Sequence, residues 1–165
     1  MRWWVITLPF FSQGIALAID EFHFHLKRPL PTWERIGHPV DTLMVLLCFC
    51  FVFIFPYSSF TLKFYILLSF LSCLCVTKDE WVHKTHAPSG EQWIHSILFI
   101  IHPLVMISIG LQWPILHEQG SQFIHPDDIL VLKLAMISFL TIMVAFWIYQ
   151  IVYWNVLKRA GDHST

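Results

Sequence analysis

Charged side chains are scarce in this sequence, and their scarcity limits what the protein can be. Asp, Glu, Lys and Arg make up 13% of its 165 residues, whereas soluble domains carry about 25%. The ten basic residues are matched by eleven acidic ones, so the formal net charge is −1. A chain without a basic surface to neutralise phosphates is not expected to bind nucleic acid.

Cysteine is also sparse and predicts no cross-linked framework. The four cysteines form two pairs, Cys48/Cys50 and Cys73/Cys75, and both pairs lie inside apolar runs. Residues two apart point to different sides of a helix, so neither pair has the geometry of a metal knuckle. We interpret all four as small apolar packing residues.

What the sequence does contain is apolar residues, 56% of the total. A hydrocarbon core about 30 Å thick needs about 20 of them in one helix. The expected spans are residues 3–24, 39–57, 60–80, 91–113 and 128–157. The first span resembles a signal peptide, but Pro9 and Gln13 interrupt it and we interpret it as a retained helix. The sequence therefore predicts an all-α integral membrane protein with a single transmembrane domain, residues 1–165, of about five helices.

Lysine and arginine gather at one end of these spans. Seven of the ten lie in the connections after the first and third spans or in the C-terminal tail, and three lie near the other face. The positive-inside rule puts the richer face in the cytoplasm, the N-terminus outside and the C-terminus inside. We expect this arrangement in a bacterial inner membrane.

The two connections on that face repeat one polar pattern. Residues 20–25 read Asp-Glu-Phe-His-Phe-His, and residues 79–86 read Asp-Glu-Trp-Val-His-Lys-Thr-His. Each stretch is followed, after a turn, by Glu-x-x-x-His, at residues 34–38 and 91–95. The matched acids and histidines would all lie at one depth, at the cytoplasmic face.

This pattern predicts a parallel internal repeat. Its halves are residues 3–57 and 60–113, related by an axis along the membrane normal, and residues 128–157 form a fifth helix outside the repeat. A four-helix arrangement would bring both copies of the polar pattern around one centre.

We expect that centre to hold metal ions, because ionisable groups beside a bilayer are costly unless they are paired or liganded. The expected ligands are Asp20, His23, Glu34, His38, Glu80, His83, Glu91 and His95. Possible further ligands are Glu21, His25, Asp41, Asp79, His86 and His102. This set exceeds what a single zinc ion needs, so two ions are expected, with iron favoured and zinc as the alternative.

Two details of the first connection follow from helix geometry. Asp20 and His23 share one helical face while Glu21 and His25 share another, and the sequence leaves open which pair faces the site. Pro39 fits best in the first turn of the second helix. That placement leaves residue 34 before the helix, in a short turn that approaches the site.

The order of acids and histidines resembles that of carboxylate-bridged di-iron proteins, including the membrane-bound alternative oxidases. In those proteins two helices each carry Glu-x-x-His and two others each carry a single Glu. The matching positions are Asp20-x-x-His23, Glu80-x-x-His83, Glu34 and Glu91, with His38 and His95 as additional nitrogen donors. The chain is also similar to the histidine-box desaturases and hydroxylases, although it has only His83-x-x-His86 of their boxes.

The resemblance implies a non-haem di-iron oxidoreductase, of hydroxylase or desaturase type, that acts on a membrane lipid or another lipophilic substrate. The sequence carries no flavin or nicotinamide motif, so a soluble electron donor is expected. One alternative is a zinc-dependent membrane lipid hydrolase, in which a metal-bound water attacks an ester or amide. Another is a metal-ion transporter or sensor, which would need more polar residues inside the spans than the sequence provides.

Overall fold

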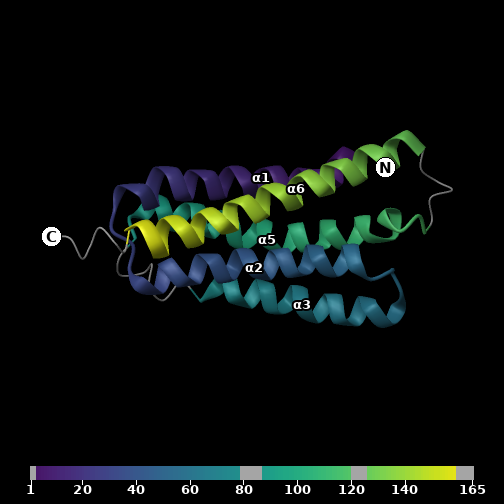
Figure 1. Cartoon of the computed structure of the whole chain (residues 1–165), viewed down its shortest axis with the longest axis horizontal. Helices are drawn as coiled ribbons and strands as arrows, with labels where there is room; N and C mark the ends of the chain where they lie inside the picture. Colours follow the sequence, from purple (N-terminus) through teal and green to yellow (C-terminus); the bar gives the residue numbers. More distant parts are fainter. Residues whose placement is uncertain (1–2, 79–86, 120–125, 159–165) are drawn as a thin grey trace.

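The computed structural model describes residues 3–78, 87–119 and 126–158. Five long helices run alongside one another in this part of the chain (Figure 1). They are α1 (Trp3–Ile19), α2 (Thr32–Ile54), α3 (Ser59–Thr77), α5 (Ser89–Leu116) and α6 (Pro126–Val152). No strand occurs among the described residues, so the predicted all-α class is confirmed for them.

Each of the five helices is long and apolar enough to cross a membrane. Large apolar side chains cover their outer surface, among them Ile15, Phe60, Ile100 and Ile142. Soluble monomers rarely expose contiguous apolar surface on this scale. The structure is therefore compatible with the integral membrane protein that the composition predicts.

The bundle is organised around α5, which contacts all four other helices. α1 packs along α5, and α2 lies between α3 and α6. The outer helices α3 and α6 bury only a small part of their surface. Residues near the start of α5 are therefore well placed to meet residues from the end of α1 and the start of α2, which lie at the same end of the bundle (Figure 1).

The apolar core occupies the half of the bundle away from that end. It is made from the first half of α1, the second halves of α2 and α5, and parts of α3 and α6. Trp113 is fully buried there, and its indole N–H donates to the carbonyl of Phe55 just after the end of α2. Tyr65 donates to the carbonyl of Met106 at 2.6 Å. Polar side chains are thus concentrated toward the opposite half.

α2 begins earlier than the sequence predicts. It starts at Thr32, so Glu34 lies in its first turn and Pro39 lies inside the helix. The proline has no N–H for the carbonyl of Arg35, four residues earlier. That carbonyl instead accepts a hydrogen bond from Asn155 Nδ2 at 3.0 Å. The prediction that Pro39 marks the first turn is wrong because a distant side chain replaces the missing donor.

Two helices end in irregular turns. α1 continues into a π-helical turn, η1 (Asp20–Phe24), and then into a 3-10 turn, η2 (His25–Lys27). α6 continues into a second π-helical turn, η4 (Tyr153–Leu157). The parallel internal repeat stays a prediction, since residues 79–86, which would supply its second copy, lie outside the described residues.

Candidate metal centre

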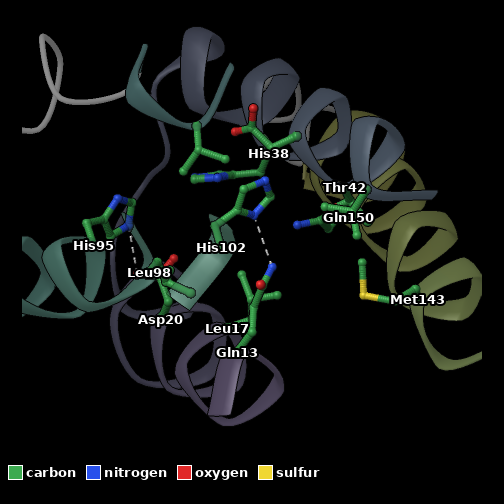
Figure 2. Close-up of a pocket in the computed structure, with 13 residues that line it drawn as sticks. Gln13, Leu17, Asp20, His38, Thr42, His95, Leu98, His102, Met143 and Gln150 are labelled. Carbon is green, nitrogen blue, oxygen red and sulfur yellow. Dashed lines mark hydrogen bonds and ion pairs between the residues drawn. The ribbon is translucent and has the colours of Figure 1, made fainter. Parts of the chain in front are cut away.

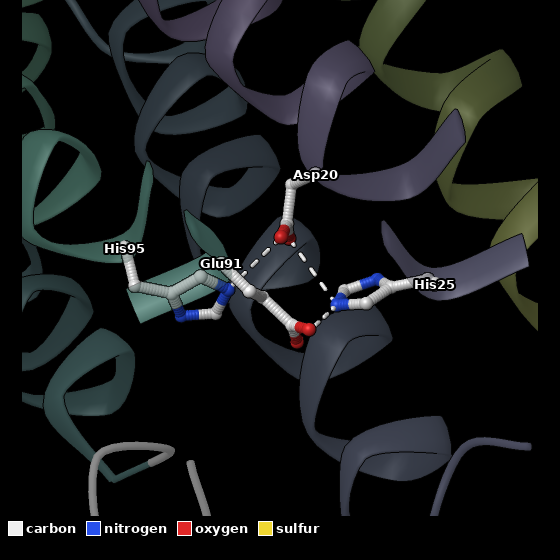
Figure 3. A group of neighbouring side chains, drawn as sticks. All are labelled: Asp20, His25, Glu91 and His95. Carbon is white, nitrogen blue, oxygen red and sulfur yellow. Dashed lines mark hydrogen bonds and ion pairs between the residues drawn. The ribbon is translucent and has the colours of Figure 1, made fainter. Parts of the chain in front are cut away.

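Four acidic and histidine side chains meet at the polar end of the bundle (Figure 3). Asp20 opens η1, His25 opens η2, and Glu91 and His95 lie on successive turns at the start of α5. All four are buried, and one donor atom from each lies within 4.8 Å of the others. This group combines residues from two segments that are far apart in the sequence.

The distances within the group suit a common ligand. His95 Nε2 lies 3.2 Å from Asp20 Oδ1. His25 Nε2 lies 3.3 Å from Glu91 Oε1 and 3.5 Å from Asp20 Oδ2. Donor atoms bound to one ion at about 2.1 Å are about 3 to 4.2 Å from one another. The four side chains therefore need little movement to surround one metal ion.

The π-helical turn explains which histidine joins Asp20. In an α-helix residues three or four apart share a face, which pairs residue 20 with His23. In η1 the His25 N–H bonds to the carbonyl of Asp20, five residues earlier. This wider turn puts Asp20 and His25 on the same side. Single-turn π-bulges of this kind occur frequently at functional sites.

Glu21 holds the His25 ring from the side away from the group. Its Oε2 lies 3.4 Å from His25 Nδ1. Its Oε1 accepts hydrogen bonds from the Tyr149 hydroxyl at 2.9 Å and from the Trp154 indole N–H at 2.7 Å. A proton on Nδ1, facing Glu21, leaves the lone pair of Nε2 directed toward Asp20 and Glu91. Metal-binding histidines are usually oriented by a carboxylate in this way.

The surroundings of His25 Nε2 are the observation that best tests the fit of a metal. His25 is 1% exposed, and its Nε2 lies within ion-pair distance of Asp20 and Glu91 without a hydrogen bond of regular geometry to a described residue. Buried polar atoms are normally paired. A metal ion bound by Nε2 and the two neighbouring carboxylates would satisfy this atom.

A second, smaller group shares His25 with the first. It consists of His25, Glu34 and His38, whose donor atoms also lie within 4.8 Å of one another. The ring centroids of His25 and His38 are 4.7 Å apart. Because His25 belongs to both groups, they are neighbouring positions rather than two complete and independent sites.

Arg28 joins the two groups. Its Nη2 lies 2.7 Å from Glu34 Oε2 and 2.5 Å from Glu91 Oε1, and its Nε donates to Glu91 Oε2 at 3.2 Å. Burial lowers the pKa of Arg28, but the carboxylates of Glu91 and Glu34 raise it by more, so the net shift is upward. The guanidinium therefore stays charged and holds the starts of α2 and α5 together.

The site is acidic. Among the described residues it contains the carboxylates Asp20, Glu21, Glu34 and Glu91 and one guanidinium, Arg28. Buried negative charge is unfavourable unless protons or cations compensate for it. This charge distribution favours the binding of a cation and opposes the binding of an anion.

Several predicted ligands lie elsewhere. His23 is exposed and accepts a hydrogen bond from Lys27 at 3.1 Å. Asp41 forms an ion pair with Lys78, with Nζ–O distances of 2.5 and 2.6 Å. His102 lies deeper in the bundle and is bonded to other polar side chains. The predicted ligands Asp79, Glu80, His83 and His86 lie outside the described residues.

The structure thus brings together Asp20, Glu34, His38, Glu91 and His95 from the expected set, with Glu21 and His25 from the possible additions. Sequence reasoning did not predict that Arg28 contacts the carboxylates of the site. It also missed Tyr149 and Trp154, because their contact with Glu21 spans more than a hundred residues. The only available signal was that both are aromatic hydrogen-bond donors near the end of the fifth span.

A cavity of about 50 Å³ extends from the metal group into the bundle (Figure 2). Asp20, His38 and His95 line it on the side of the metal groups, and Gln13 and His102 line the part nearer the middle of the helices. Its remaining lining residues are Leu17, Asp41, Thr42, Val45, Val76, Leu98, Met143 and Gln150. By volume it has room for one or two waters, or for the polar end of a larger molecule.

The cavity continues a network of buried polar side chains. Gln13 Nε2 lies 3.3 Å from His102 Nδ1, and Ser72 Oγ lies 3.0 Å from His102 Nε2. On another wall, the Thr42 hydroxyl donates to Gln150 Oε1 at 2.8 Å. These hydrogen bonds form two separate groups, one of Gln13, His102 and Ser72 and the other of Thr42 and Gln150.

No family model, curated protein or solved structure matches the chain.

Proposed function

We propose that this chain is a membrane metalloenzyme whose metal ion is bound by Asp20, His25, Glu91 and His95. The observation that carries the proposal is the convergence of these four buried donors, with His25 Nε2 directed at two carboxylates and its other nitrogen facing Glu21.

The donor set suits iron. Two histidines combined with a carboxylate are the ligands of non-haem iron oxygenases, and the same ligands also bind catalytic zinc. We therefore propose an iron-dependent oxidoreductase of hydroxylase or desaturase type. A bound iron would supply the activation of dioxygen. The protein would bind the ion, orient His25 through Glu21 and exclude bulk water from the buried group.

A second ion is proposed at His25, Glu34 and His38. Arg28 donates to Glu34 and to both oxygens of Glu91, so its guanidinium would repel a cation at either position until it turns away. We propose that the four-donor position fills first, because it offers one donor more than the second position. The metal content then distinguishes a one-iron from a two-iron form of the enzyme.

Hydroxylation of a C–H bond by dioxygen consumes two electrons and two protons and releases one water, so a donor of electrons is required. A groove of about 320 Å³ beside the centre is lined by Lys27, Arg28, Arg35 and Lys158. Its positive charge suits an acidic soluble protein. We propose that the electron donor docks at this cytoplasmic end.

Metal transport is the weaker alternative. The buried polar network reaches Gln13 and His102, but the described core beyond it is apolar and includes Phe49, Val105 and Ile109. An ion path would need polar groups or water through that half. The described residues favour a site that is closed on that side.

The test is metal analysis of the detergent-purified protein after growth with iron and zinc. We expect at least one iron per chain, and its loss in His25→Ala and Glu91→Gln. The matched control is His23→Ala, which removes an exposed histidine two residues from His25 and should leave the iron content unchanged. One zinc per chain would favour the lipid hydrolase instead. A wild-type protein without stoichiometric metal would disprove the metalloenzyme.

A further inference from the structure

A cleft separates α1 from α6 next to the cavity that extends from the metal group. The two helices touch near the middle of each, where the ring centroids of Phe10 and Phe139 are 5.0 Å apart. They are joined again toward the metal group by the hydrogen bond from Tyr149 to Glu21, just beyond the end of α1. Between these contacts a Cβ atom placed on Gly14 would meet no other atom within 4 Å. The opening there has a volume of about 350 Å³.

The cleft is apolar and leads to the cavity beside the metal group. Its walls include Ile142, Leu17 and Met143, and Val45 forms part of its floor. Gln13 is the polar exception. Gln13, Leu17, Val45 and Met143 also line the cavity that reaches Asp20 and His95. An apolar chain entering between α1 and α6 would therefore bring one end toward the metal group.

Gln13 has a polar atom that is available to such a molecule. The side chain is 7% exposed, and its Nε2 is bonded to His102. Its Oε1 has no hydrogen-bond partner among the described residues. Exchanging the amide oxygen and nitrogen still leaves one polar atom unmatched, because His102 occupies only one of them. As oriented, Gln13 offers an acceptor that a hydrogen-bond donor in the cavity would satisfy.

The charge of the neighbouring site restricts what that donor can be. Asp20 lines the same cavity, and Glu91 lies 3.3 Å from the shared neighbour His25. A fatty-acid carboxylate at this position would meet like charge and could not donate to Gln13 Oε1. A hydroxyl group is neutral, donates one hydrogen bond and fits a cavity of about 50 Å³.

We propose that the cleft between α1 and α6 binds the chain of a long-chain alcohol, with its hydroxyl group donating to Gln13 Oε1. This inference rests on the proposed metalloenzyme, for which it names the substrate class. Apolar contact with Leu17, Ile142 and Met143 supplies affinity, and Gln13 distinguishes an alcohol from a hydrocarbon of the same length.

The experiment measures saturable binding of tritiated hexadecan-1-ol to the purified protein in detergent. Unlabelled hexadecane, hexadecanoate and phosphatidylcholine serve as competitors. We expect hexadecanoate and phosphatidylcholine to compete at least tenfold more weakly than unlabelled hexadecan-1-ol. Gln13→Leu should weaken binding of the alcohol by about five- to tenfold, the effect of one hydrogen bond, and leave competition by hexadecane unchanged.

Bulk placed in the cleft gives the second measurement. Gly14→Phe should abolish binding of both the alcohol and the hydrocarbon, because the new ring fills the open space beside residue 14. The matched control is Ala145→Phe, which adds a similar ring at an exposed position of α6 that does not line the cleft. Unchanged iron content in each variant shows that the bundle has folded.

The outcomes separate the two proposals. Three results would each overturn the alcohol site: no saturable binding of hexadecan-1-ol, an equal loss of affinity for the alcohol and for hexadecane in Gln13→Leu, or stronger competition by phosphatidylcholine than by the alcohol. If the protein nevertheless contains iron, the proposed metal centre stands. Alcohol binding to a protein without stoichiometric metal would overturn the substrate role together with the proposed enzyme and leave a binding cleft alone.

Discussion

His95 Nε2 and Asp20 Oδ1 belong to residues 75 positions apart in the chain and lie 3.2 Å from each other. A proton on Nε2 makes this contact a hydrogen bond that joins the end of α1 to the start of α5. A proton on Nδ1 instead leaves two adjacent metal donors. The same pair of atoms can therefore stabilise the bundle without a metal ion and contribute to its ligand set with one.

Replacing Glu21 by Gln should weaken metal binding without removing a ligand. The amide can still accept from Tyr149 and Trp154, but it lacks the charge that orients the His25 ring. Loss of such a supporting carboxylate lowers metal affinity by about 10- to 100-fold. Competition with a chelator of known affinity measures the change. The matched control is Glu118→Gln, an exposed position paired with Lys133, and equal effects in both variants would contradict the role given to Glu21.

Replacing Arg28 by Met should destabilise the metal-free protein more than the metal-bound protein. The substitution leaves Glu34 and Glu91 facing each other without the guanidinium between them. Removal of one partner from a buried ion pair costs about 3 kcal/mol. Thermal unfolding in detergent, with and without added Fe(II), measures the difference. Lys27→Met is the control on an exposed side chain, and an equal loss of stability in both metal states would contradict this account.

Asn155→Leu should destabilise the protein by about 1–2 kcal/mol, because it removes the hydrogen bond from Asn155 to the carbonyl of Arg35. That hydrogen bond replaces the one that Pro39, which has no backbone N–H, cannot donate. Pro39→Ala restores a backbone N–H at that position. In the Pro39→Ala background the same Asn155→Leu change should therefore cost much less. A double-mutant cycle of unfolding free energies measures the coupling, and strictly additive effects would show that the two residues do not serve the same carbonyl.

His102→Gln should leave the iron content unchanged. Both ring nitrogens of His102 are engaged by Gln13 and Ser72, at 3.3 and 3.0 Å, and the residue is not part of either group of converging donors. His95→Gln, a substitution of the same type on the same helix, should lower the iron content. If His102→Gln also removes the metal, the ligand set extends deeper into the bundle than the structure indicates.

The helical class and the approximate positions of the five helices could be predicted from the sequence because they depend on local properties. Hydropathy over about 20 residues locates the spans, and the clustering of acids and histidines locates the polar end. The choice between His23 and His25 could not be made, since it depends on a π-helical turn that a regular period of 3.6 residues does not contain. His23 and His25 have similar neighbours in the sequence, yet His23 is exposed and His25 is buried in the site.

The start of α2 shows the same limit. The sequence favours a helix that begins near Pro39, and nothing in residues 31–39 reveals that Asn155 will supply the missing hydrogen bond. The position of Arg28 between two carboxylates also depends on packing, because Glu34 and Glu91 belong to different helices. Such features become predictable only once the contacts between distant segments are known.

The hydrogen bonds from Tyr149 and Trp154 to Glu21 also bear on how the protein is made. Synthesis proceeds from the N-terminus, so the carboxylate leaves the ribosome long before either of its donors. During that interval Glu21 lacks both aromatic donors, so the His25 ring does not yet have all the contacts that fix its orientation. The site is therefore completed late in biosynthesis, and a chain truncated before residue 149 would carry every ligand of the four-donor group without the side chains that align them.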